Sequence, residues 1–467
     1  MFFEIKSSDR LAVITSNGEK ITYAELSEYV NKSSEKLESR KLAFVLCENS
    51  PASLISYLVC LNKRIVPLLI DKKIDKDLLE NLLKTYDPDY LFVPEIKAEE
   101  FKGKYELLDC ILNYNLMNNK QPGDTRLYEN LALLLTTSGS TGSPKLVRQS
   151  YVNIQSNAEA ICKYLNLTED ERPVTTLPMN YTYGLSIINS HLQAGATILM
   201  TDLPMNMKPF WNFVNNESAT SFGGVPFTYE MLKKVGFFKM KVPSIRYMTQ
   251  AGGKLSPLLH KEFATWAFEN DKEFIVMYGQ TEATARMAYL PADKSLEKYG
   301  SVGIAIPGGK FSIIDVDGNE ITEAFKDGEL VYKGDNVTLG YAECKEDLTK
   351  GDERGGILET GDMAKFDSDG FYYIVGRKKR FLKVFGNRVN LDEVDRIVKE
   401  YFENIDCTSA GEDDHLIMFI TDETKLSEVR RWLASTTHLS ESAFEVRFIE
   451  SIPRNEAGKV LYKDLPV

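Results

Sequence analysis

A glycine-rich segment, TTSGSTGSPK (136–145), contains residues whose types and spacing could bind phosphate. It follows the apolar run LALLL (131–135) and precedes SYVNIQSNAEAICKYL (150–165), in which apolar residues recur near helical spacing. A strand, a glycine-rich loop and a helix in this order direct backbone N–H groups towards an anion. The glycines permit a tight path, hydroxyl side chains add donors, and one lysine adds positive charge. These residues are Ser138, Gly139, Ser140, Thr141, Gly142, Ser143 and Lys145.

The composition of this loop has a second explanation, a solvated surface turn. It is not a Walker A loop, because Pro144 and Lys145 follow Ser143 and the pattern GxxxxGK[ST] does not fit. A P-loop kinase or ATPase is therefore disfavoured. The loop by itself leaves the turn and the phosphate site equally open.

Four further residues could take part in nucleotide chemistry, and each also has an ordinary structural explanation. In MYGQTE (277–282), Tyr278 offers a flat ring and Glu282 a carboxylate suited to Mg²⁺. They could equally be a core tyrosine and a surface glutamate. Asp362, in the tripeptide TGD, could simply shape a turn, and composition alone makes Lys459 another surface lysine.

The elements that must position these residues follow an alternating pattern. Short β-rich runs such as LAFVLCE (42–48) alternate with helical patterns such as PASLISYLVCLNK (51–63), and the same alternation returns from 197 to 277. Strand and helix in alternation predict a mostly parallel sheet covered by helices, so two such layers are expected. From about Gly303, Asp-Gly pairs between β-rich runs predict hairpins, and a smaller α+β segment follows Lys379.

The overall composition is that of a folded acidic protein. The chain has 467 residues, 43% of them hydrophobic, and a formal net charge of -12. An acidic chain is a poor partner for nucleic acid or for an anionic membrane surface. No targeting segment or metal-ligand spacing is visible, and the six cysteines are scattered, so we expect a cytoplasmic protein with reduced thiols and no membrane insertion.

The loop TTSGSTGSPK resembles the signature phosphate loop of the AMP-forming adenylating superfamily. That superfamily comprises acyl-CoA synthetases, nonribosomal-peptide adenylation domains and beetle luciferases. Seven further motifs of the superfamily follow in the correct order, so that the resemblance covers nearly the whole chain. They are LPMNYTYGL (177–185), QAGGKL (250–255), MYGQTEATA (277–285), GELVYKGDNVTLGY (328–341), TGD (360–362), GRKKRFLKVFGNRV (376–389) and NEAGKVL (455–461).

The resemblance implies a role for each matched residue. Tyr278 would stack on adenine, Thr281 would contact the α-phosphate, and Glu282 would hold Mg²⁺. Asp362 would accept hydrogen bonds from both ribose hydroxyls, assisted by Arg377. The complete set of implied ATP- and AMP-binding residues is Thr137, Ser138, Gly139, Ser140, Thr141, Gly142, Lys145, Gly252, Gly253, Lys254, Tyr278, Gly279, Gln280, Asp362 and Arg377. Lys254 departs from the small residue or proline usual at its position.

The catalytic residue implied by the resemblance is Lys459, together with Thr281 and Glu282. The reaction joins a carboxylate to the α-phosphate of ATP, and an ammonium group between these two anions lowers their repulsion. For the second half-reaction the C-terminal domain would rotate about a hinge at Lys379. That rotation would bring Lys383 and Gly386 towards the thiol.

The implied fold is α/β. It consists of a large N-terminal domain (1–377) of two αβ layered subdomains plus a small β-barrel-like subdomain. A small mobile α+β lid domain (378–467) follows it.

The resemblance also places an acid pocket. Its residues would be Tyr181, Val225, Pro226, Phe227, Ala251 and Met277. Amino-acid-activating members carry an aspartate where this chain has Thr182. Without that carboxylate a substrate ammonium would be poorly matched, so we expect an acid with a neutral aliphatic or aromatic tail, and an amino acid as the second choice.

The implied activity is that of an AMP-forming acid:thiol ligase, most like a stand-alone acyl-CoA synthetase. It would use ATP, Mg²⁺ and coenzyme A. Two alternatives remain: an enzyme that loads an acyl or amino acid onto the phosphopantetheine of a separate carrier protein, and a non-catalytic nucleotide-binding member of a biosynthetic assembly. The identity of the acid and the oligomeric state are left open.

Overall fold

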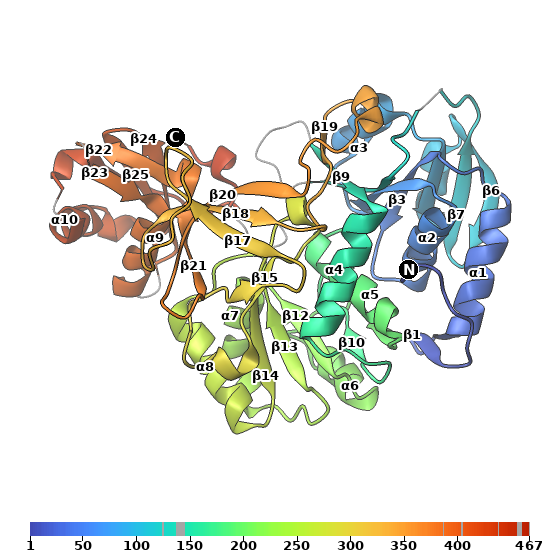
Figure 1. Ribbon diagram of the computed structural model, residues 1–467, viewed down its shortest axis with the longest axis horizontal. Coiled ribbons are helices and arrows are strands. Elements are labelled where there is room, and N and C mark those ends of the chain that lie inside the picture. The colour runs from blue at the N-terminus through green and yellow to red at the C-terminus, as the bar shows by residue number, and fades with distance from the viewer. Residues whose placement is uncertain are drawn as a thin grey trace. The chain divides into compact units, whose positions relative to one another are not determined.

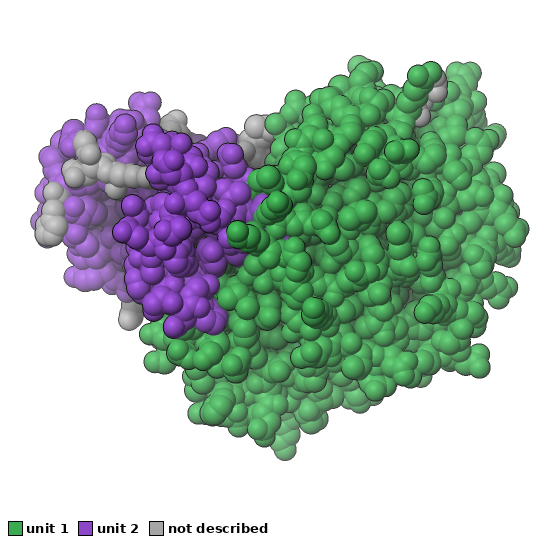
Figure 2. Space-filling model, in the orientation of Figure 1, with its two compact units in different colours: residues 1–139, 143–310, 333–358 green, residues 140–142, 311–332, 359–467 purple. Residues whose placement is uncertain are grey.

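The computed structural model describes residues 1–123, 126–136, 145–385, 387–402, 405–437, 439–454 and 460–466 (Figure 1). The described residues form two compact units (Figure 2). Unit 1 comprises the described residues within 1–136, 145–310 and 333–358, and unit 2 comprises those within 311–332 and 359–466. Each unit is described separately below.

The first sheet of unit 1 has a parallel centre. Strands β3 (Leu42–Cys47), β4 (Val66–Asp71), β5 (Tyr90–Pro94) and β8 (Leu131–Thr136) pair in parallel in the order β8-β4-β3-β5. Every residue of β3 is buried, as expected for a strand covered on both faces. The edge strands are β19 (Gly340–Ala342), β9 (Leu146–Ser150), β7 (Tyr114–Asn119) and β6 (Tyr105–Ile111).

The helices of this layer begin at recognisable caps. In α2 (Pro51–Asn62) the Ser50 side chain accepts from the backbone of Ser53, with proline in the first turn. In α1 (Tyr23–Glu35), Thr22 and Glu25 form a complete capping box. Helix α3 (Lys76–Tyr86) begins at Asp75, whose side chain accepts a hydrogen bond from the backbone of Leu78.

The second sheet of unit 1 carries the motifs of the predicted acid and adenine sites. Its order among the described residues is β16-β15-β14-β13-β12-β10-β11-β1-β2, and β10 to β14 pair in parallel. The strands are β1 (Leu11–Thr15), β2 (Lys20–Thr22), β10 (Pro173–Val174), β11 (Ile198–Met200), β12 (Ser221–Gly224), β13 (Tyr247–Gln250), β14 (Glu273–Tyr278), β15 (Ala288–Tyr289) and β16 (Ile304–Ala305). The accompanying helices are α4 (Tyr151–Tyr164), α5 (Thr182–Ala194), α6 (Lys208–Asn216), α7 (Pro226–Lys234) and α8 (Pro257–Glu269). The prediction of two α/β layers is confirmed.

Unit 2 contains the predicted hairpins and a separate α+β core. Strands β17 (Lys310–Ile314), β18 (Gly328–Lys333), β20 (Ile357–Phe366) and β21 (Tyr372–Arg377) form a four-stranded sheet, which belongs to unit 2 except for the strand-end residues 310, 333 and 357–358. The β20–β21 hairpin turns at Gly370, whose φ of 81° lies in the left-handed region that glycine adopts freely. Thus the Asp-Gly pair at this position is a turn, as predicted.

The C-terminal part of unit 2 has its own hydrophobic core. This part contains a hairpin of β22 (Phe381–Val384) and β23 (Asn387–Asn390). It also contains a three-stranded sheet of β24 (Cys407–Glu412), β25 (His415–Ile420) and β26 (Phe444–Phe448), with helices α9 (Leu391–Tyr401) and α10 (Leu426–Thr437). The two compact units do not mark a hinge, so the boundary after Arg377 stays a prediction. Among the described residues every helix is too short or too polar to cross a bilayer.

Candidate active site

The MYGQTE motif lies at the carboxyl end of β14, the edge at which parallel α/β sheets carry their ligands. Tyr278 ends the strand, and the 3₁₀ turn η3 (Thr281–Ala283) begins after two intervening residues. Gly279 makes this turn possible, because a Cβ atom there would lie 1.5 Å from the carbonyl oxygen of Ala285. The sharp turn places Glu282 immediately beyond the end of the sheet.

Glu282 is held by a set of contacts from distant parts of unit 1. Its Oε1 accepts a hydrogen bond of 2.8 Å from the hydroxyl of Tyr341. Its backbone carbonyl accepts from the Thr338 hydroxyl and from Nη1 of Arg354, each at 3.0 Å. Burial and the neighbouring Glu282 carboxylate raise the pKa of Tyr341 to about 12, so its hydroxyl remains a donor at neutral pH. The carboxylate therefore has a fixed orientation.

The same carboxylate suits a magnesium ion bound to ATP. Among the described residues, Oε2 of Glu282 takes no hydrogen bond, and no cluster of three metal-ligating side chains is found. Magnesium in nucleotide sites typically uses one or two carboxylates and takes its other ligands from phosphates and water. A single oriented carboxylate with one open oxygen fits that pattern.

Two cationic side chains lie close to the ring of Tyr341, the residue that donates to Glu282. The guanidinium of Arg354 lies 4.7 Å from the centre of the Tyr341 ring, and the ammonium of Lys145 lies 5.2 Å from it. Lys145 also pairs with Glu343 at 2.8 Å, and both side chains are exposed. An exposed pair of this kind is weak, so Lys145 can exchange its partner for a phosphate. The predicted loop residues Thr137, Ser138, Gly139, Ser140, Thr141 and Gly142 lie outside the described residues.

The segment predicted to line adenine borders the predicted acid pocket. Gly252 has a φ of 84°, and a Cβ atom there would lie 2.5 Å from the Tyr181 hydroxyl and 3.1 Å from Val225. Gly253 packs in the same way on Pro226, with 3.1 Å between its notional Cβ and the proline ring. The side chain of Lys254 is exposed.

Most of the predicted acid-pocket residues share one apolar cluster. Tyr181, Val225, Ala251 and Met277 belong to it, together with Tyr183. Phe227, by contrast, is 60% exposed. The residues therefore converge from α5, α7 and the ends of β13 and β14, with Phe227 at the surface.

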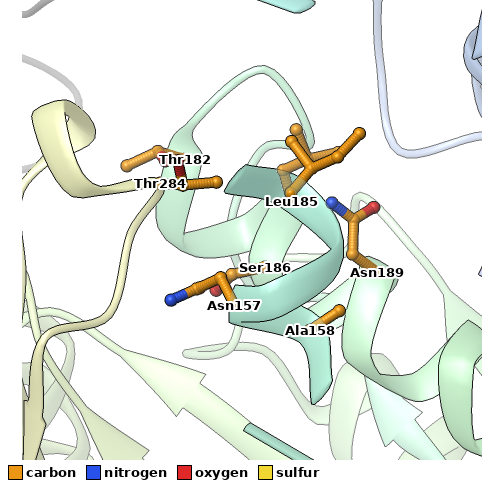
Figure 3. A pocket seen from close by; sticks show the side chains of 8 residues that line it. Asn157, Ala158, Thr182, Leu185, Ser186, Asn189 and Thr284 are labelled. Carbon is orange, nitrogen blue, oxygen red and sulfur yellow. The ribbon is translucent and has the colours of Figure 1, made fainter. Parts of the chain in front are cut away.

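A short polar strip runs beside this cluster between α4 and α5. Figure 3 shows Thr182, Ser186 and Thr284 there, close to Asn157, around a small cavity of about 10 Å³. The Ser186 hydroxyl accepts a hydrogen bond of 3.1 Å from Nε of the buried Arg286. Burial raises the pKa of Tyr181, and the charge of Arg286 acts in the opposite direction.

The predicted ribose-binding pair lies in unit 2. Asp362 on β20 and Arg377 on β21 face each other across the hairpin, and Nε of Arg377 lies 2.8 Å from Oδ1 of Asp362. The Asp362 side chain is buried whereas Arg377 is half exposed. Cross-strand pairing thus brings together two residues that the motifs place fifteen positions apart.

Two of the residues predicted for the hinge and the second half-reaction lie in the described part of unit 2. Lys379 is in the 3₁₀ turn η6 (Lys378–Arg380) and Lys383 is on β22, and both are exposed. Gly386 and Lys459 lie outside the described residues. The structure therefore describes the surroundings of Lys379 and Lys383, but not those of Gly386 or of Lys459, the residue predicted to catalyse adenylation.

Several residues that the structure brings to the site had no role predicted from the sequence. Tyr341 ends the quoted motif GELVYKGDNVTLGY, so a signal was present, but nothing in the sequence pairs its hydroxyl with Glu282. Arg286 follows MYGQTEATA directly and could have been noticed as a charge within an apolar run. Arg354 carried no signal, since it comes from an irregular loop.

Comparison with known proteins identifies similar chains. The sequence model of the family described as AMP-binding enzyme matches residues 5–342. Among curated relatives, a 2-succinylbenzoate–CoA ligase of Bacillus pumilus is 24% identical over 97% of this chain and 94% of the relative. The peroxisomal OPC-8:0-CoA ligase 1 of Arabidopsis thaliana is 27% identical over 98% of this chain and 90% of the relative.

Solved structures share the fold. The O-succinylbenzoate coenzyme A synthetase from Bacillus subtilis in complex with AMP has a TM-score of 0.79 at 21% identity, covering 98% of this chain and 96% of that chain. ATP-bound MatB from Rhodopseudomonas palustris has a TM-score of 0.78 at 21% identity, covering 99% of each chain. The predicted fold class, a large N-terminal part with a small C-terminal domain, is confirmed.

Proposed function

This chain belongs to the AMP-binding enzyme family, and we propose that it is an acid:thiol ligase that activates a carboxylic acid with ATP and transfers the acyl group to coenzyme A. The resemblance predicted from the eight motifs is confirmed by the family match. The curated relatives named above are CoA ligases, and they cover nearly the full length of this chain. The predicted enzyme class follows from these relatives.

The observation that carries the proposal is the oriented Glu282 carboxylate at the end of β14, with Tyr341, Arg354 and Lys145 around it. A carboxylate can coordinate Mg²⁺, and cationic side chains beside it attract the phosphate oxygens. The two together suit a complex of Mg²⁺ with a polyphosphate. When bound, Mg²⁺ would neutralise charge on the phosphates as pyrophosphate leaves. Glu282 would hold it, and Lys145 would contact the leaving phosphates.

The first half-reaction forms an acyl-adenylate. An oxygen of the acid attacks the α-phosphorus of ATP, the bond from that phosphorus to the bridging oxygen of the β-phosphate breaks, and pyrophosphate leaves. Lys459 would lie between the two approaching anions, and Thr281 would donate to the α-phosphate. Tyr278 would cover adenine, and Asp362 with Arg377 would bind the ribose hydroxyls.

The second half-reaction transfers the acyl group. The thiol sulfur attacks the acyl carbon, the carbon–oxygen bond to the phosphate breaks, AMP leaves, and the thiol proton passes to solvent. We propose that residues 378–467 act as a lid that turns about Lys379 and exchanges Lys459 for Lys383 and Gly386. Residues 1–377 would remain as the adenylate-forming domain.

The acceptor in this proposal is coenzyme A, supported by the names of the relatives. The thiol of a carrier protein's phosphopantetheine would react in the same way and remains the alternative acceptor. Two measurements separate the possibilities: acid-dependent exchange of labelled pyrophosphate into ATP reports the first half-reaction, and mass spectrometry of the thioester product reports the acceptor. Exchange that proceeds without any thioester on free coenzyme A would favour a carrier protein.

A further inference from the structure

Arg286 is a fully buried arginine beside the predicted acid pocket. It is 2% exposed. Its Nε donates to Ser186 at 3.1 Å, and its Nη1 donates to the Tyr164 hydroxyl at 3.0 Å and contacts the sulfur of Met277. Its guanidinium carbon lies 4.6 Å from the centre of the Tyr183 ring. All of these partners are electrically neutral.

The charges of Arg148 and Arg380, the other buried arginines among the described residues, are compensated by carboxylates. Arg148 pairs with Glu353 and donates to backbone carbonyls, and Arg380 pairs with Asp392 and Asp395. These contacts explain both side chains as structural links. For Arg286, no carboxylate among the described residues lies within ion-pair distance, and its Nη2 group has no hydrogen-bond acceptor there.

A buried guanidinium without a counter-ion is unfavourable for folding. Removing a charged group from water has a large free-energy cost. Hydrogen bonds to neutral hydroxyls and a contact with an aromatic ring compensate for only part of it. The arrangement is reasonable if an anion reaches the site in the functional state. The available Nη2 group and the fork geometry of arginine suit a carboxylate in particular.

The position of Arg286 indicates which anion this is. Met277, which it contacts, is a predicted acid-pocket residue and immediately precedes Tyr278, the predicted adenine neighbour. Arg286 also lines a cavity of about 10 Å³ between α4, α5 and strands β12 and β13. An acid whose reacting carboxylate points towards the nucleotide would therefore direct its tail to this side chain.

We propose that the acid activated by this protein carries a second carboxylate, which binds the guanidinium of Arg286. This inference rests on the proposed function and replaces the neutral-tailed acid expected from Thr182. It also disfavours an α-amino acid, because Arg286 would repel the ammonium group and no aspartate occupies position 182.

The direct test compares matched acids on the wild-type protein. Pyrophosphate exchange is measured with malonate, succinate, glutarate and adipate, each beside the unbranched monocarboxylate of the same carbon number. We expect at least one diacid to exceed its neutral counterpart in kcat/KM by about 30-fold or more, the size expected for a buried charge pair. Exchange with the monocarboxylates but with none of the diacids would overturn the inference and leave the proposed function intact. No exchange with any acid would count against the proposed function itself.

Variants then assign the preference to Arg286. Arg286→Gln should lower kcat/KM for the preferred diacid by about 30-fold and leave or improve the neutral acid, whereas Arg286→Lys should retain part of the preference. Arg396→Gln is the matched control, since Arg396 pairs with Glu393 and Glu400 on the surface of α9. Equal losses for both acids in Arg286→Gln would overturn the inference, because they indicate a structural role. If that variant does not fold, the Arg286→Lys ratio and the wild-type comparison still decide the question.

Discussion

Tyr341→Phe removes a single oxygen atom from the centre of the proposed metal site. The lost hydroxyl donates the 2.8 Å hydrogen bond to Glu282. The ring remains, and so do the cations of Arg354 and Lys145 that lie over it. The variant therefore isolates the orientation of the Glu282 carboxylate from the rest of the site.

The size of the effect follows from this one contact. A hydrogen bond to a charged group contributes about 1.5–3 kcal/mol, and Tyr341 is half-buried, so the lower end applies. About 1.5 kcal/mol corresponds to about a tenfold change in an equilibrium or rate constant. We expect kcat/KM for adenylation to fall by about tenfold, with part of the loss recovered at high Mg²⁺ because a poorly oriented carboxylate binds the metal less tightly.

The assay follows the two half-reactions separately. Pyrophosphate exchange is measured over a series of Mg²⁺ concentrations, and thioester formation is measured from prepared acyl-adenylate and coenzyme A. The second rate should stay near that of the wild type, because pyrophosphate and its metal have already left. Tyr401→Phe is the control, since Tyr401 is exposed and its ring stacks on Trp432.

Two results would refute the reasoning about Tyr341. One is an unchanged Mg²⁺ dependence in Tyr341→Phe, which would mean that the hydroxyl does not orient a metal ligand. The other is an equal loss of both half-reactions, which would indicate a general disturbance of unit 1.

Three further perturbations test other parts of the molecule. Gly252→Ala should lower the unfolding free energy by about 1 kcal/mol or more and reduce adenylation, because φ is 84° and the new Cβ would lie 2.5 Å from the Tyr181 hydroxyl; urea denaturation measures the first effect. Burial lowers the pKa of His191 from 6.5 to about 4, so the unfolded chain takes up a proton first as the pH falls. The neutral His191 ring makes its full contribution to the free energy of unfolding above pH 6.5. Up to about 3 kcal/mol of that free energy is lost as the pH falls towards 4. His191→Gln should flatten the slope of unfolding free energy against pH in that window, and an unchanged slope would contradict the assignment. Lys459→Ala should abolish pyrophosphate exchange and spare thioester formation from prepared acyl-adenylate, whereas equal loss of both rates would argue against a lid exchange.

Much of the fold could be predicted because its signals are local. The alternation of apolar runs and helical patterns indicated the α/β layers, and the Asp-Gly pair at Gly370 indicated a hairpin. Motif order also assigned Asp362 and Arg377 to one predicted ribose site, and the two residues lie opposite each other across the β20–β21 hairpin.

The rest could not be predicted because it depends on contacts between distant segments. The hydroxyl of Tyr341 reaches Glu282 across fifty-nine positions, and Arg286 reaches Ser186 across one hundred. Burial of Arg286 without a counter-ion becomes visible only when the helices α4 and α5 are in place. Phe227, in contrast, was predicted from its position in the VPF stretch to line the acid pocket. In the structure its side chain is 60% exposed.

The central claim, adenylation of a carboxylic acid, is tested most directly by exchange of labelled pyrophosphate into ATP with the purified protein, Mg²⁺ and a panel of acids. The account predicts exchange that requires a particular acid, that is lost in Glu282→Gln, and that gives way to net thioester formation when coenzyme A is added. Nucleotide binding without acid-dependent exchange for any member of a broad panel would contradict it and would favour a non-catalytic nucleotide-binding role.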